Sequence, residues 1–315
     1  MPLLRPSLII VTGSNRGIGK AVCQQILKRP DIGPLKLFAT SRSGEDLGLE
    51  STKERQTVYR RLDVSKRESI DALRDEVKAD KDGGGVRLLV NNAGINLDNE
   101  KGMGRLEAAR KTIGVNFEGT LDMCCTFLPH LSKDTGRIVN LSSVASSLKP
   151  YSEEIQRRFR SALFLSDVET LAEEYLVRLN MLTFRKPSLT TNDPKHAVET
   201  STEQSSGFSI PPRHYAMSKA LVRAMTRVLS GEHHAAHPES KILINSCCPG
   251  WINTDMGGLV GSGRTMPPKT AEEGAGIVMR LGFDELEDED RWGVSGEYWA
   301  NESVRSRGLG SVQRW

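Results

Sequence analysis

The fold of this chain is decided by residues 7–19, which read Ser7-Leu8-Ile9-Ile10-Val11-Thr12-Gly13-Ser14-Asn15-Arg16-Gly17-Ile18-Gly19. Residues 7–11 form a short, mainly apolar stretch with several β-branched side chains, as expected for a buried parallel strand. A glycine-rich turn follows, and residues 20–28 then have the apolar spacing of a helix. A strand, a glycine-rich turn and a helix in this order predict a binding site for the phosphates of a dinucleotide.

Each glycine of the turn has a predicted role in that site. Gly13 permits the tight turn, Gly17 lets the backbone approach the pyrophosphate, and Gly19 lets the helix pack close to the sheet. The helix N-terminus offers free N–H groups to the phosphates. We expect the turn residues between the glycines to line the same site, namely Ser14, Asn15, Arg16 and Ile18. A flexible loop is the simpler alternative, but it leaves the flanking strand and helix unexplained.

The second predicted strand, residues 35–40, indicates which dinucleotide binds. An acidic residue near its end would hold a ribose 2′-hydroxyl, whereas this chain has Arg42 there and Arg16 in the glycine turn. Arginine suits a 2′-phosphate, so we predict NADP(H) as the cofactor. The alternative is that Arg42 is a solvated loop charge.

Strands and helices alternate along the rest of the chain. Further strands are predicted at residues 58–62, 86–90, 136–141, 242–246 and 296–300, and helices at 65–79, 111–131, 215–232 and 270–281. Ser65 and Glu68 have the spacing of a capping box, and Thr270 is placed to cap the last helix. This alternation predicts an α/β fold with a Rossmann-type, doubly wound parallel sheet of about seven strands. Ligands bind beyond the C-terminal strand ends of such sheets, where Asp63, Val64 and residues 91–94 fall.

Tyr215 and Lys219 form the candidate proton-transfer pair. Residues four apart share one face of a helix, which would place the phenol beside the ammonium. A nearby cation favours the phenolate, so we expect the pKa of Tyr215 to fall and the residue to act as a general acid or base. An exposed pair on a surface helix is the simpler alternative for a motif this short.

The composition excludes several classes of protein. The 315 residues have ordinary hydrophobic and charged fractions, 37% and 26%, and a net charge of +3 that is too small to suggest binding to nucleic acid or a membrane surface. We interpret the five cysteines as reduced thiols of a cytoplasmic protein. His233, His234 and His237 could suggest a zinc site, but no cysteine or acidic residue stands at ligand spacing. A polar helix end explains them better, and we predict no metal.

Taken together, four motifs resemble the short-chain dehydrogenase/reductase family. They are the glycine turn, Asn91-Asn92-Ala93-Gly94, the Ser142-Ser143 pair and Tyr215-Ala216-Met217-Ser218-Lys219. Within the family, the chain is most similar to the monomeric, NADPH-dependent carbonyl reductases. These enzymes have a sequence similar to Cys247-Cys248-Pro249-Gly250-Trp251, and they have an insert before the tyrosine. The resemblance implies a single domain over residues 1–315 with an insertion at about 148–211.

The resemblance also implies a role for each site residue. Tyr215 would donate a proton to the substrate oxygen, Ser143 would polarise that oxygen, with Ser142 as the alternative, and Lys219 would bind the ribose and lower the pKa of the tyrosine. Asn116 would support a water relay to Lys219. Further cofactor contacts are implied for Asn92, Ala93, Gly94, Pro249, Gly250, Ile252 and Thr254.

The implied activity is NADPH-dependent reduction of a ketone, aldehyde or quinone to an alcohol. Three alternatives stay open: an alcohol dehydrogenase, an imine or enone reductase, and a non-catalytic NADP-binding regulator. In the insert, residues 153–182 have apolar positions at helical spacing, namely Ile155, Phe159, Leu163, Leu171, Tyr175 and Leu179. We expect this part to cover the surface through which other members associate, which predicts a monomer. Residues 188–207 and 260–268 are expected to be a lid and a mobile substrate loop.

Overall fold

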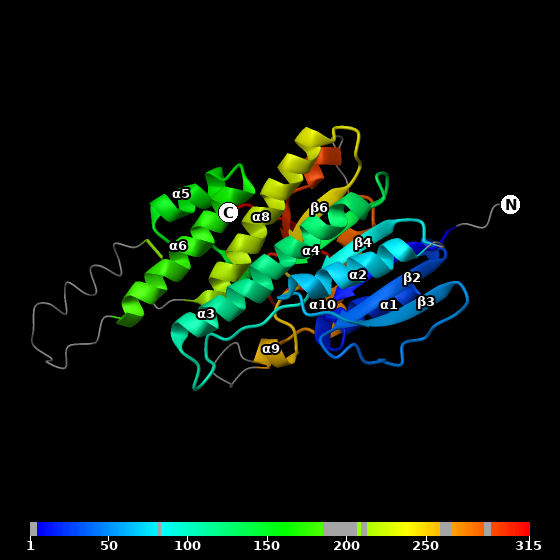
Figure 1. Cartoon of the computed structure of the whole chain (residues 1–315), viewed down its shortest axis with the longest axis horizontal. Helices are drawn as coiled ribbons and strands as arrows, with labels where there is room; N and C mark the ends of the chain where they lie inside the picture. Colours follow the sequence, from blue (N-terminus) through cyan, green and yellow to red (C-terminus); the bar gives the residue numbers. More distant parts are fainter. Residues whose placement is uncertain (1–4, 81–82, 185–206, 209–212, 259–265, 287–290) are drawn as a thin grey trace, which may run out of the picture.

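The computed structural model describes residues 5–80, 83–184, 207–208, 213–258, 266–286 and 291–315. Its centre is an eight-stranded sheet in the order β3-β2-β1-β4-β5-β6-β7-β8 (Figure 1). Every neighbouring pair from β3 to β7 is parallel, and the short β8, which the sequence analysis did not predict, pairs antiparallel with β7. The strands are β1 Ser7–Thr12, β2 Leu35–Ser41, β3 Arg55–Arg61, β4 Val86–Asn91, β5 Arg137–Leu141, β6 Leu243–Cys247, β7 Tyr298–Ala300 and β8 Ser311–Val312.

Helices cover both faces of the sheet, which confirms the doubly wound architecture. Along β1, Leu8 and Ile10 join the core on one face, whereas Ile9 and Val11 join the core on the other. The first core lies under α2 (Arg67–Ala79), α4 (Gly119–Phe127) and α8 (His214–Ala236), and the second lies under α1 (Gly17–Lys28) and α10 (Ala271–Phe283). A strand buried on both faces must be apolar at every position, which explains the continuous apolar run in the sequence.

The helix predicted at residues 111–131 is longer and less regular than expected. It begins as α3 (Arg105–Ile113), passes through a π-helical segment η2 (Gly114–Glu118) into α4, and ends in a 3-10 turn, η3 (Leu128–His130). Such single π-turns are often found at functional sites. Asn116 lies in the π-helical segment and is completely buried.

The insertion forms two helices where the sequence suggested one continuous stretch. These are α5 (Glu153–Ser161) and α6 (Leu165–Phe184), and the chain turns between them at Leu163, whose surface is 68% exposed. The carboxylate of Asp167 accepts the N–H groups of Leu163 and Phe164, which explains why a new helix starts here. The other five predicted apolar positions are buried as expected: Ile155, Phe159, Leu171, Tyr175 and Leu179.

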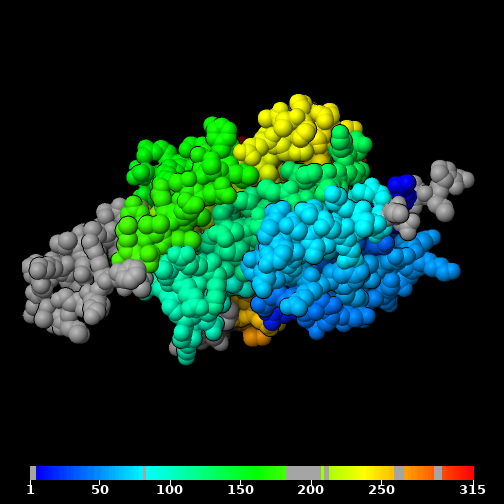
Figure 2. Space-filling view, in the orientation of Figure 1, coloured from blue at the N-terminus to red at the C-terminus, as the bar shows by residue number. Residues whose placement is uncertain are grey.

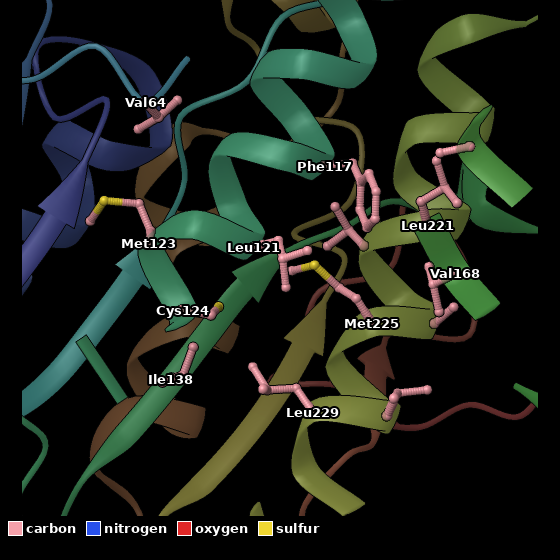
Figure 3. Close-up of a cluster of buried hydrophobic side chains, with 14 of the residues drawn as sticks. Val64, Phe117, Leu121, Met123, Cys124, Ile138, Val168, Leu221, Met225 and Leu229 are labelled. Carbon is pink, nitrogen blue, oxygen red and sulfur yellow. The ribbon is translucent and has the colours of Figure 1, made fainter. Parts of the chain in front are cut away.

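Helix α6 packs on α3 and α8 and belongs to the main core rather than to a separate unit. Figure 2 shows α5 and α6, in green, lying directly against the body of the molecule. In Figure 3, Val168 of α6 lies beside Leu221 and Met225 of α8, and Phe117 of the π-helical segment reaches the same cluster. All of the predicted lid at residues 188–207 except Gly207, and most of the predicted loop at 260–268, lie outside the described residues.

Two capping predictions had opposite outcomes. Thr270 caps the start of α10 as expected, and Glu273 completes a capping box with it. The box predicted at Ser65 was wrong, because the Ser65 hydroxyl and N–H both bind the carboxylate of Asp63, and α2 begins two residues later without a side-chain cap. A nearby carboxylate competes successfully for the serine that would otherwise cap the helix.

The remaining short elements are η1 (Pro30–Ile32), η4 (Val144–Ser146), α9 (Asp255–Gly258) and η5 (Arg291–Val294). Within the described residues, no helix is both long and apolar enough to cross a membrane. All five cysteines are free thiols. His233 bonds to the Ser240 hydroxyl and His234 to the Ile242 carbonyl, as polar residues at the end of a helix do.

Candidate active site

The predicted site residues meet at the C-terminal edge of the sheet, where the loops after six strands converge. The strand order reverses between β1 and β4, which is where dinucleotides bind in such folds. The glycine turn follows β1, Arg42 follows β2 and Asp63 lies after β3. Residues 92–94 follow β4, Ser142 and Ser143 follow β5, and residues 249–254 lie after β6.

The glycine turn has the conformation that its sequence predicts. Gly13 and Gly17 have φ angles of 64° and 53°, which side chains with a Cβ rarely adopt. A Cβ at Gly19 would overlap the Gly13 carbonyl and the Asn92 amide, so only glycine fits where α1 meets the sheet. A methyl group at Gly17 would lie 3.0 Å from the Thr254 methyl carbon.

Hydrogen bonds join this turn to the neighbouring strand ends. The Thr12 hydroxyl accepts the N–H groups of Asn92 and Ala93 at 3.0 and 2.9 Å, and the Asn92 amide donates to the carbonyls of Thr12 and Gly13. On the other side, the N–H of the buried Ser14 donates to the Thr40 carbonyl at 2.9 Å. The turn is therefore held on both sides, as a rigid phosphate site requires.

The start of α1 is chemically suited to an anion. Its N-cap residue, Arg16, provides no side-chain cap, and its first turn contains no acidic residue, so the N–H groups there face a ligand without competition. Half-buried Asn15 and Ile18 flank this point. A cofactor diphosphate fits both the charge and the glycine geometry of this turn.

The two arginines predicted to select the cofactor have different surroundings. Arg16 forms an exposed ion pair of 2.5 Å with Asp255 at the start of α9, whereas Arg42 is exposed at the end of β2. Burial works to raise the pKa of Asp63, but hydrogen bonds from Ser65 outweigh it and, with the charges of Lys66 and Arg42, hold that pKa below its usual value. Asp63 is therefore a carboxylate close to Arg42, and its neighbour Val64 is buried.

Ser143 and Tyr215 are brought together by two elements far apart in the sequence. Ser143 is the N-cap of η4, where its hydroxyl accepts the Ala145 N–H, and its side chain is close enough to the Tyr215 phenol to lower the pKa of that group. Ser142 instead donates its hydroxyl to the carbonyl of Lys219 at 2.9 Å and is buried. The geometry therefore favours Ser143 over Ser142 as the substrate-facing serine.

The expectation that the pKa of Tyr215 falls was wrong. Burial raises that pKa above its usual value, the electrostatic effect of Cys248 adds to the rise, and the Ser143 side chain opposes it only in part. The Lys219 nitrogen lies 5.7 Å from the centre of the tyrosine ring, so the two side chains are neighbours without forming an ion pair. Desolvation of the phenolate therefore outweighs the attraction of a cation at this distance.

Lys219 and Asn116 are buried beside the motif that follows β4. The ammonium of Lys219 donates to the Leu141 carbonyl at 2.7 Å, and burial lowers its pKa to about 8. The Asn116 side chain accepts the N–H of Ile95 and donates to the Ile95 carbonyl, both at 2.8 Å, and also donates to Ser218. A Cβ at Gly94 would lie 3.1 Å from the Asn116 oxygen and 3.5 Å from the Lys219 nitrogen, so both side chains come close to the backbone of Gly94.

The loop after β6 completes the site. The Pro249 carbonyl accepts a hydrogen bond of 2.9 Å from the buried Lys269, and Gly250 has a φ angle of 100°. Ile252 is buried. The Thr254 hydroxyl accepts the Gly257 N–H at 3.1 Å and caps α9, so a contact with a cofactor carboxamide would require it to change partners.

Sequence comparison identifies the family. The family model for short chain dehydrogenase matches residues 7–155. Carbonyl reductase (NADPH) 1 of Bos taurus is 34% identical over 299 residues, which cover 94% of this chain and 96% of the relative. This chain belongs to the short-chain dehydrogenase/reductase family.

Solved structures show the same fold as this short-chain dehydrogenase. Salutaridine reductase from Papaver somniferum has a TM-score of 0.68 at 24% identity and covers 93% of this chain and 99% of its own. An NADPH-bound carbonyl reductase from chicken fatty liver has a TM-score of 0.61 at 22% identity, with 99% and 95% covered.

Sequence reasoning missed one residue of this dehydrogenase site. Asp98, in the loop after β4, accepts the backbone N–H of Tyr215 at 3.1 Å across 117 residues of sequence. Its carboxylate thus caps the start of α8 and lies near the proton donor. No motif could have shown this, because an aspartate in a polar loop has no spacing that refers to a distant helix.

Proposed function

We propose that this protein is an NADPH-dependent carbonyl reductase that converts a ketone, aldehyde or quinone carbonyl to an alcohol. The observation that carries the proposal is the convergence of the Ser143 side chain, the buried Tyr215 phenol and the buried Lys219 at the C-terminal edge of the sheet. The name of the Bos taurus relative supports the same activity and cofactor.

In the proposed reaction, the carbonyl compound, NADPH and a proton become the alcohol and NADP+. NADPH, when bound, supplies the hydride to the carbonyl carbon. Ser143 donates a hydrogen bond to the carbonyl oxygen, and the Tyr215 hydroxyl delivers its proton to that oxygen. A raised pKa keeps Tyr215 protonated at neutral pH, which is the state that reduction needs.

Lys219 and Asn116 support this step. With a pKa of about 8, Lys219 is charged at neutral pH, and we propose that it binds the nicotinamide ribose. Asn116 holds the backbone of Ile95 on one side and Ser218 on the other, which fixes the loop after β4 against the catalytic helix. We propose that this arrangement supports a water relay that returns a proton to Tyr215.

Arg42 is the proposed selector of NADPH over NADH, supported by its exposed position at the end of β2 beside Asp63. The glycine turn and the loops after β4 and β6 are proposed to bind the rest of the cofactor. Arg42→Asp should raise the KM for NADPH far more than the KM for NADH. Equal preference for the two cofactors in the wild type would contradict this assignment.

We also propose that the chain works as a single domain and a monomer in the cytoplasm. The packing of α6 on α3 and α8 supports the first two statements, since it covers the long helices through which other members would associate. The five free thiols support a reducing compartment.

The activity is tested by NADPH oxidation with a panel of simple diketones, quinones and aldehydes. We expect turnover by the wild type and a loss of at least about 10²-fold in Tyr215→Phe, the usual contribution of a placed general acid. NADPH binding should persist in the variant, because the tyrosine ring is retained. A wild type that binds NADPH and reduces none of the panel would favour a non-catalytic role.

A further inference from the structure

Trp315 contacts the turn that carries the proposed substrate-binding serine. Its indole N–H donates to the Ser146 carbonyl at 3.1 Å. The Ser146 N–H in turn donates to the Ser143 carbonyl at 2.9 Å and closes the one-turn helix η4. The indole therefore bonds directly to the backbone of the turn that begins with Ser143.

The same indole ring also contacts the catalytic helix. The guanidinium carbon of Arg223, on α8, lies 4.4 Å from the centre of the Trp315 ring and 4.1 Å from that of Tyr298. A hydrogen bond of 2.7 Å from Arg223 to the Gln313 carbonyl strengthens this contact. Arg223 lies four residues after Lys219, so the helix that presents Tyr215 and Lys219 also holds Trp315.

A third contact comes from the insertion. Phe159 of α5 meets the Trp315 ring edge-on, with the ring centres 5.9 Å apart. Arg227 of α8 donates to the carbonyls of Phe159 and Ala162, so α5 is fixed to the same helix. In Figure 1 the C-terminus lies between α5 and α8, in agreement with these contacts.

We propose that Trp315 is a positioning residue that sets the Ser143 hydroxyl relative to the Tyr215 phenol. Its ring is held by α8 and α5, while its N–H holds η4, so it connects the two elements that present the reacting hydroxyls. Small displacements of reacting groups reduce rates strongly, and a side chain that bonds to both elements limits such displacements. This inference rests on the proposed reductase activity and adds a residue that makes no contact with the reacting atoms.

The test is Trp315→Phe, which keeps an aromatic ring for Arg223 and Phe159 but removes the N–H donor. One neutral hydrogen bond is lost, so we expect kcat to fall about threefold to tenfold. The dissociation constant of NADPH, measured by fluorescence titration, should stay at the wild-type value, because Trp315 acts on the serine turn. A variant that lost only stability would show a lower melting temperature and an unchanged kcat.

Trp299→Phe is the matched control. Trp299 lies on β7 with Arg280 over its ring at 5.2 Å, and in the described part of the chain its buried indole nitrogen has no hydrogen-bond partner. The same substitution at Trp299 therefore removes an N–H that donates no hydrogen bond within the described residues. It should leave kcat at the wild-type value even if it lowers the melting temperature.

Amide hydrogen exchange of residues 145–147 gives a readout independent of activity. These amides bond to the Ser143 hydroxyl and to the Ser143 and Val144 carbonyls, so loss of the Trp315 donor should speed their exchange about threefold to tenfold, whereas Trp299→Phe should not. Unchanged exchange in Trp315→Phe overturns the inference. So does unchanged kcat in an active enzyme. A wild type without reductase activity contradicts the proposed function instead, and the exchange result still decides the role of Trp315.

Discussion

Lys219 is the residue whose protonation should set the alkaline limit of activity. Burial lowers its pKa to about 8, so the ammonium is lost as the pH rises through that value. If the charge is needed to bind the cofactor ribose, kcat/KM for NADPH should fall about tenfold per pH unit above this point, since this parameter reports on groups of the free enzyme.

The Lys219→Arg variant is the control for this pH dependence, because a guanidinium stays charged throughout the same range. Its turnover should be reduced, but the fall above pH 8 should disappear from its profile. An alkaline limb at the same position in both proteins would assign that limb to another group.

Asp98 is predicted to fix the start of α8 and to influence the proton donor. Asp98→Ala removes the acceptor of the Tyr215 N–H and should lower kcat about threefold to tenfold, the effect of about one hydrogen bond. Asp98→Asn keeps an oxygen acceptor and should retain more of the turnover.

The matched control for Asp98 is Glu100→Gln in the same loop. Glu100 is exposed, and among the residues that the structure describes its one hydrogen bond is from its backbone N–H to the Leu97 carbonyl, so this change removes a nearby charge without touching α8. An equal loss of turnover in Asp98→Ala and Glu100→Gln would mean that general surface charge, rather than the contact with Tyr215, is responsible.

At the scale of elements, α6 should unfold together with the sheet. Leu171 is 1% exposed and belongs to the main core, so Leu171→Ala should lower the free energy of unfolding of the whole protein by about 2–5 kcal/mol. The measurement is urea denaturation followed by circular dichroism. If α6 were an independent appendage, the main transition would keep its wild-type midpoint.

Val177 provides the control on the same helix, because 51% of its surface is exposed. Val177→Ala should change the free energy of unfolding by no more than about 0.5 kcal/mol. Comparable losses in the two variants would contradict the assignment of the Leu171→Ala effect to burial, because alanine favours the helix at both positions.

For the whole molecule we predict a monomer with a mass near 34.7 kDa in light scattering after gel filtration. The reason is that α6 covers α3 and α8, so the apolar surface of those helices is already buried within one chain. A mass twice as large at micromolar concentration would contradict the prediction. Deletion of residues 153–182 should expose this surface and cause association or aggregation.

The sequence by itself determined the sheet, the glycine turn and the identity of the proposed reacting groups. Residues 7–19 are sufficient for the first β-α unit, because strand periodicity and glycine conformations are local properties of a chain. The positions of Ser143, Tyr215 and Lys219 were predictable from motifs. Their local frame, a strand end for the serine and a helix for the other two, is as expected.

The tertiary structure decided everything that depends on groups far apart in the sequence. It raised the pKa of Tyr215, because burial by distant elements outweighs one cation at 5.7 Å. It turned Ser142 towards the Lys219 carbonyl, and it brought Asp98 and Trp315 to the two elements that present the hydroxyls. Desolvation and contacts of this kind arise only when the chain is packed. The spacing of residues along the sequence therefore does not predict them.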